Sequence, residues 1–242
     1  ETVSKHKMRN IIYLLSLAII FGCQNKNTEI NIDHEIIDSI QINNEYFENG
    51  NISLIKEYNL STGITEYAKY YESGELERTG AAKDSIRIGE WHNYSKKGEL
   101  TLWQQYVNYK NSKYLNQIIY YNEDGSVNES NSSYYDIKSN MDTVLLGDTL
   151  VMNFRLGNSV YKKGLMILLG ELNTDNTWKN ESTIDTLLNN DYYFDLNLNL
   201  VAKDLGDNLI QGQIIDYTSY IEDDKLIYEQ RVMFFSEEYF VE

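Results

Sequence analysis

The pattern of apolar and polar residues divides the chain into three parts. An uninterrupted apolar run occupies residues 11–21. Between 42 and 136, short apolar and aromatic segments recur between polar turns. From 141 to 242 the pattern becomes an alternation with a period of two, which is typical of half-buried strands. Since no long segment has the 3.6-residue period of a helix, the pattern predicts an all-β fold.

The C-terminal part, 141–242, is predicted to form a β-sandwich. Leu196, Leu198 and Leu200 alternate strictly with polar residues, as in a strand with one buried face and one wet face. Five or more such segments, separated by polar turn clusters, predict a small immunoglobulin-like sandwich. Gly212 lies inside one of them and indicates a bulge or a close approach of two backbones. The predicted strands lie at 150–156, 165–169, 194–200, 210–214 and 232–235.

Four glycines mark a repeat between 42 and 136. They are separated by 24, 24 and 27 residues, and each has Tyr four residues before it and Ile, Leu or Val two residues after it. A glycine at such a place supplies the positive φ of a tight turn, with its Tyr and aliphatic neighbours on one face of two strands. Each hairpin buries little alone, so the repeat predicts an elongated antiparallel sheet of stacked hairpins. The turn glycines are Gly50, Gly74, Gly98 and Gly125.

This repeat resembles the MORN-repeat variant family, whose units read aromatic-x-x-x-Gly-x-aliphatic and continue into a Gly-x-Trp segment. Gly89-Glu90-Trp91 supplies the Gly-x-Trp segment here. The resemblance implies a non-enzymatic scaffold or binding surface, and bacterial members of the family are often antitoxin components. The repeat aromatics are interpreted first as packing residues and alternatively as an exposed recognition face. The candidate binding residues are Tyr67, Tyr70, Trp91, Tyr94 and Trp103.

The N-terminal segment combines a basic stretch at 5–9 with the apolar run at 11–21. This order is the signature of a cleaved signal peptide, and the run is shorter than the roughly 20 residues that span a membrane. The ending Ile20-Phe21-Gly22-Cys23 resembles the lipobox of bacterial lipoproteins, although Phe21 is larger than the residue usual there. The resemblance implies a signal peptide at 1–22, acylation of Cys23 with chains such as palmitate, and a flexible tether at 23–41.

The same resemblance suggests a location. Gln24 stands where an aspartate retains lipoproteins in the inner membrane, so the outer membrane of the envelope is favoured and the leaflet is left open. Met8 is an alternative start.

The charge balance limits the possible partners. The formal net charge is −16, and removal of 1–22 leaves 18 basic and 36 acidic residues, a net charge of −18. Such a surface repels nucleic acid and anionic lipid, so membrane attachment has to be covalent. We expect a protein or glycan partner. The alternative is an immunity or antitoxin protein whose acidic surface neutralises a basic toxin.

No constellation of residues predicts catalysis. After processing, the histidines are His34 and His92, and Cys23 carries lipid, so thiol catalysis and a histidine-rich zinc site are not supported. Ser53-Leu54-Ile55-Lys56 matches Ser-x-x-Lys but lies in a β pattern. The turn at 122–125 lacks the ligand spacing of an EF-hand. We therefore expect no catalytic residue, no metal and no cofactor.

Overall fold

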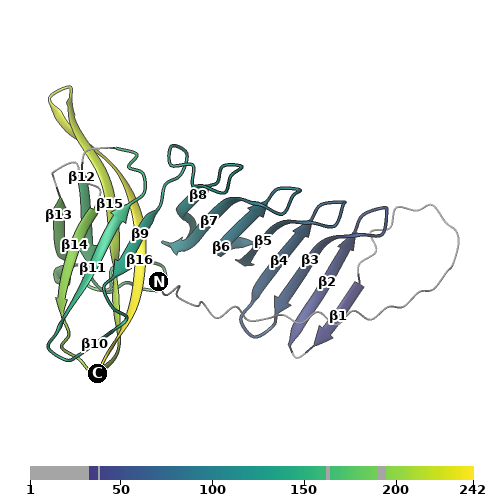
Figure 1. Ribbon diagram of the computed structural model, residues 1–242, viewed down its shortest axis with the longest axis horizontal. Helices are drawn as coiled ribbons and strands as arrows, with labels where there is room; N and C mark the ends of the chain where they lie inside the picture. The colour runs from purple at the N-terminus through teal and green to yellow at the C-terminus, as the bar shows by residue number, and fades with distance from the viewer. Residues whose placement is uncertain (1–32, 38, 162–163, 190–194) are drawn as a thin grey trace, which may run out of the picture. The chain divides into compact units, whose positions relative to one another are not determined.

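The computed structural model describes residues 33–37, 39–161, 164–189 and 195–242. These residues are almost entirely β-strands, with one short 3₁₀ helix at Glu181–Thr183. The strands form three sheets (Figure 1), which confirms the predicted all-β fold. The predicted signal peptide and Cys23 lie outside the described residues.

The first sheet, here called the repeat sheet, holds eight antiparallel strands in chain order. Its first strand and the start of its second occupy the end of the predicted tether at 23–41, so that prediction is wrong from residue 33 onward. The physical reason is pairing: the backbones of Asp33–Ile37 and Ile40–Tyr46 satisfy one another's polar groups in a continuous ladder. The strands are β1 (Asp33–Ile37), β2 (Ile40–Tyr46), β3 (Ile52–Asn59), β4 (Ile64–Tyr70), β5 (Leu76–Lys83), β6 (Ile86–Tyr94), β7 (Leu100–Tyr109) and β8 (Ser112–Tyr120).

The four repeat turns share one geometry. Their glycines have φ between 81° and 101°, in the left-handed region that the repeat pattern requires. In every turn the glycine N–H donates to the C=O three residues earlier, at 2.9 to 3.0 Å. The repeat tyrosine and the aliphatic residue six positions later lie directly opposite each other. These pairs are Tyr46 with Ile52, Tyr70 with Leu76, Tyr94 with Leu100, and Tyr121 with Val127.

The other two sheets face each other and form the predicted sandwich. One has the order β14-β11-β9 and the other β10-β16-β15-β12-β13. In immunoglobulin nomenclature, β9, β11 and β14 stand at strands A, B and E, and β12, β15 and β16 stand at C, F and G. The strands are β9 (Tyr135–Ser139), β10 (Thr143–Val144), β11 (Thr149–Leu156), β12 (Gly164–Leu169), β13 (Asp185–Asn189), β14 (Asp195–Val201), β15 (Gly206–Glu222) and β16 (Lys225–Val241).

The sandwich begins earlier than predicted. Its first strand, β9, starts at Tyr135 rather than after 141, because Ile137 and Tyr135 pair with Phe154 and Leu156 of β11. The main hydrophobic core lies between the two sheets and draws side chains from all five predicted strands, and a smaller cluster is formed by Val144, Ala202 and Val241. The buried members of the main core are Leu150, Met152, Phe154, Leu156, Leu165, Ile167, Leu198, Ile210, Ile214, Met233 and Phe235.

Gly212 marks a close approach and not a bulge. The register of β15 against β16 runs through Gly212 without a shift. A Cβ atom at this position would lie 2.1 Å from the carbonyl oxygen of Leu168 and 2.9 Å from the ring of Phe235. Glycine is therefore required here by space, which resolves the two alternatives that the sequence left open.

Asn116 joins the repeat sheet to the sandwich. It is the extra residue of a β-bulge in β8, since Gln105 pairs with Gln117 while Tyr106 pairs with Leu115. Its side chain, 1% exposed, bonds both the N–H and the C=O of Phe234 in β16. This amide therefore bonds the backbone of β16 as a neighbouring strand would, on the edge where β10 pairs further along the strand.

Candidate functional site

The five candidate aromatic residues lie on two different faces of the repeat sheet. Side chains alternate along each strand, and cross-strand pairs place Tyr67 beside Gly80 and His92 beside Trp103. Tyr67 and Trp91 share one face, called here the Trp91 face. Tyr70, Tyr94 and Trp103 share the other, called the Trp103 face. The five candidates therefore do not form one site: Tyr67 and Trp91 pack together on one face, and Tyr70, Tyr94 and Trp103 lie on strands β4, β6 and β7 of the other.

Trp91 is a packing residue. It is 6% exposed, and its indole lies over Gly80, where a Cβ atom would approach the ring to 2.2 Å. Its Nε1 donates to the C=O of Ala81 at 3.0 Å, and the guanidinium carbon of Arg87 lies 4.3 Å from the ring centroid. Tyr67 completes the stack, with its ring centroid 6.0 Å away. The indole is thus covered on both sides and its N–H is satisfied, so it presents little surface to a partner.

The Trp103 face carries a more open group of rings. His92 and Tyr94 lie nearly parallel, 18° apart in plane, with ring centroids separated by 6.4 Å. Trp103 is half-buried and lies across the strand pair from His92. Glu90 lies beside His92, with Oε2 3.7 Å from Nε2. These side chains form a polar and aromatic surface at the C-terminal end of the repeat sheet.

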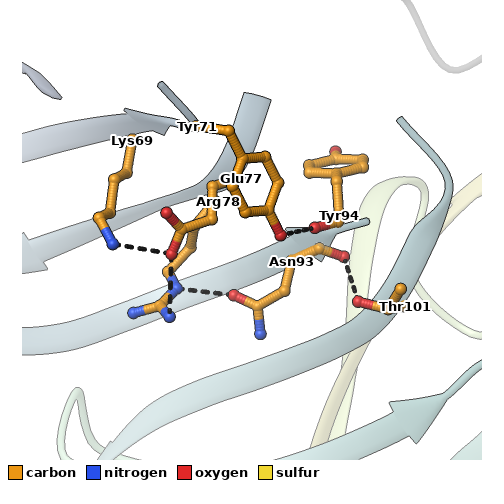
Figure 2. Close-up of polar contacts among 7 residues, drawn as sticks. All are labelled: Lys69, Tyr71, Glu77, Arg78, Asn93, Tyr94 and Thr101. Atoms are coloured by element: carbon orange, nitrogen blue, oxygen red, sulfur yellow. Dashed lines mark hydrogen bonds and ion pairs between the residues drawn. The ribbon is translucent and has the colours of Figure 1, made fainter. Parts of the chain in front are cut away.

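Polar contacts connect consecutive repeats along the turn edge (Figure 2). The hydroxyl of Tyr71 donates to the C=O of Tyr94 at 2.8 Å, which ties the second turn to the third. Asn93 accepts from Arg78 Nε through its side chain and from Thr101 through its C=O. A shallow hollow of about 600 Å³ lies here, lined by Phe47, Lys69, Tyr70, Tyr71, Glu72, Ser73, Glu77 and Lys96.

A cleft of about 400 Å³ lies where the Trp103 face meets the sandwich. The repeat sheet contributes one aromatic wall, Trp103, together with carboxylate and amide side chains. The sandwich contributes residues of β9, β15 and β16. The polar side chains among the lining residues are Glu90, Gln105, Asn116, Gln117, Asp136, Asn176, Gln211, Ser236 and Glu237.

Main-chain groups fix the orientation of the amides in the cleft. Phe234 N–H donates to Asn116 Oδ1 at 2.7 Å and its C=O accepts from Asn116 Nδ2 at 2.8 Å, which distinguishes the two amide atoms. Asn116 Nδ2 also donates to Gln105 Oε1 at 2.7 Å. Gln117 Nε2 donates to the same oxygen at 3.0 Å, while Gln117 Oε1 accepts from Tyr135 N–H. Gln105 Oε1 is therefore engaged twice, and its Nε2 has no acceptor among the described residues.

The charge in the cleft is negative. Glu90, Asp136 and Glu237 line it, and none of the described lining residues is Lys or Arg. Burial raises the pKa of the half-buried Glu237 above its usual range. In the described part of the chain, its carboxylate has neither a hydrogen bond nor an ion pair. Burial also raises the pKa of Tyr135, and the charge of Glu237 adds to this effect.

Sequence reasoning identified Trp103 but missed the cleft around it. Gln105 lies more than a hundred residues before Gln211 and Glu237 in the chain, and no local motif connects the three. The one available signal was the longer interval of 27 residues before the last glycine. That interval contains the bulge at Asn116, where the two parts of the chain meet.

The described part of the chain contains no group of three His, Cys, Asp or Glu side chains arranged to hold a metal ion. It also contains no helix that is long and apolar enough to cross a membrane. Comparison with protein-family models, curated proteins and solved structures finds no match to this chain.

Proposed function

We propose that the protein is an envelope lipoprotein that is anchored through Cys23 and acts as a non-enzymatic binding or scaffold module. The observation that carries the binding role is the cleft beside Trp103, where an indole, unsatisfied polar atoms and an unpaired carboxylate converge. The partner is a protein or a glycan. The anchor rests on the basic and apolar N-terminal segment that ends at Cys23, and the outer membrane is the favoured location.

A second candidate function is neutralisation of a basic toxin by an immunity or antitoxin protein. The acidic lining of the cleft and the net charge of −18 after processing favour it, because a strong negative field attracts a basic protein from a distance. The resemblance of the repeats to MORN-variant units in antitoxin components supports the same role. Binding of a basic toxin is expected to weaken strongly at high salt, and this distinguishes the second function from the first.

The anchor is tested with Cys23→Ala. The wild-type protein, expressed in a Gram-negative host, is expected to enter the detergent phase of a two-phase separation. Removal of the acyl acceptor is expected to shift it to the aqueous phase, because several acyl chains on one residue provide stable attachment. Gln24→Ala, next to the same site, serves as the matched control. Detergent-phase partitioning of Cys23→Ala would rule out lipidation at this residue.

The binding role is tested by capture from envelope extracts at low and high salt. Trp103→Ala is expected to reduce the captured amount at least about tenfold, because a ring at the centre of an interface often dominates affinity. Tyr120→Ala removes an exposed ring from the opposite face of the neighbouring strand and is expected to change nothing. Capture that disappears at high salt indicates the basic-toxin role. Equal capture by the two variants contradicts a binding surface at Trp103.

A further inference from the structure

We propose that the cleft at Trp103 is a saccharide site for one or two uncharged sugar rings of a glycan. This inference rests on the proposed binding function and deepens it by naming the ligand class. The cleft volume of about 400 Å³ falls within the range of roughly 300 to 1,000 Å³ that is usual for small-ligand sites. The half-buried indole of Trp103 offers a flat apolar wall, which suits the C–H face of a sugar ring.

The hydrogen-bonding capacity of the cleft selects a ligand with both donors and acceptors. Gln105 Nε2 is a donor without an acceptor, because Gln105 Oε1 is held by Asn116 and Gln117. Glu237 is an acceptor without a donor among the described residues. Each sugar hydroxyl both donates and accepts, so adjacent hydroxyls can satisfy both groups. An ammonium or guanidinium group has no acceptor and would leave the Gln105 donor unpaired.

The carboxylates that line the cleft disfavour a negatively charged ligand. Glu90 and Glu237 raise the energy of any carboxylate, sulfate or phosphate placed beside them, and none of the described residues that line the cleft is Lys or Arg. Asp136 adds less to this effect, because Lys138 Nζ lies 3.3 Å from its Oδ2. Acidic sugars are therefore disfavoured. The internal amide network holds Gln105 in place before binding, so little side-chain entropy is lost when a ligand enters.

The test uses the purified full chain on an array of neutral and acidic oligosaccharides, with an arginine-rich peptide spotted beside them. We expect binding to neutral oligosaccharides, and calorimetry then gives the Kd of the best one. Trp103→Ala and Glu237→Gln are each expected to raise that Kd by about tenfold or more. The first removes a ring contact with the sugar, and the second removes a charge-assisted hydrogen bond. Tyr120→Ala and Glu238→Gln, which alter exposed neighbours outside the cleft, are expected to leave it unchanged.

Loss of folding does not explain the expected result for Glu237→Gln. Because burial raises the folded-state pKa of Glu237, the protonated form adds stability at low pH, and this contribution is lost as pH rises through the folded pKa. A neutral glutamine is therefore expected to melt at the wild-type temperature or above it at neutral pH. Binding only to the peptide, binding only to acidic sugars, or neutral-sugar binding that survives both cleft substitutions would each overturn the saccharide site. Capture from envelope extracts without any array binding would overturn it while leaving the binding function intact.

Discussion

Asn116→Leu is expected to lower the free energy of unfolding by about 2 to 4 kcal/mol, because it removes three buried hydrogen bonds and leaves the N–H of Phe234 without a partner. The C=O of Phe234 keeps the hydroxyl of Tyr135, and Gln105 Oε1 keeps Gln117 Nε2. The side chain of Asn116 satisfies the N–H and C=O of Phe234 and one lone pair of Gln105 Oε1, at 2.7 to 2.8 Å. Leucine has nearly the same volume but no polar atoms. Urea denaturation followed by circular dichroism and tryptophan fluorescence measures the loss.

A second consequence of this substitution is uncoupling. The contacts of Asn116 with Phe234 are one part of the junction between the repeat sheet and the sandwich, beside the bond from the Tyr114 hydroxyl to the C=O of Val232 and the bond from Arg231 to the C=O of Asn116. The variant is therefore expected to unfold less cooperatively than the wild type. Asn93→Leu is the matched control, because Asn93 is a half-buried amide that bonds only within the repeat sheet, to Arg78 through its side chain. It is expected to cost about 1 kcal/mol. An unchanged midpoint for Asn116→Leu would contradict the junction described here.

Gly212→Ala is expected to destabilise the sandwich by about 3 kcal/mol or more. The added Cβ atom meets the carbonyl oxygen of Leu168 at 2.1 Å and the ring of Phe235 at 2.9 Å. A backbone oxygen in a sheet ladder cannot move aside without breaking pairing, so β12 and β15 have to separate locally. Thermal melting and hydrogen exchange of the amides in β12 measure the effect.

Gly170→Ala supplies the comparison for this prediction. There the nearest atoms belong to the ring of Trp178, at 3.1 to 3.3 Å, and a side chain can shift by a few tenths of an ångström. We expect a cost of about 1 kcal/mol or less at Gly170. Equal effects of the two substitutions would show that the close approach at Gly212 is not what constrains this position.

The repeat turns were predictable because the relevant interactions are local. A tyrosine four residues before each glycine and an aliphatic residue two residues after it indicate a hairpin, and the structure pairs those two positions in all four turns. The sandwich strands were predictable for a similar reason. Alternation along Leu150 to Leu156 reports a buried face regardless of what covers it.

The burial of individual aromatics and the cleft were not predictable in this way. Trp91 and Trp103 both lie in strand segments with Tyr three residues later, yet Trp91 is buried over Gly80, which lies opposite Tyr67 on the neighbouring strand. That arrangement depends on strand register, which single-sequence patterns do not determine. The cleft is formed by residues far apart in the chain, at a junction that includes the contact between Asn116 and Phe234, 118 positions apart. Strand β1 was missed because it lies in the segment at 23–41 that was interpreted as a flexible tether.

The strands of the repeat sheet pair in the order in which they follow one another in the chain, so the width of the sheet is given by the number of strands. Seven steps of about 4.8 Å separate β1 from β8, so the sheet spans about 34 Å across its strands. Each 24-residue unit supplies two strands and therefore about 10 Å. Because successive hairpins contact mainly their neighbours, adding or removing a unit would change the reach between the N-terminal edge and the sandwich while leaving both ends intact. The number of hairpins thus sets the distance between the cleft and β1, the described strand that is nearest to Cys23 in the chain.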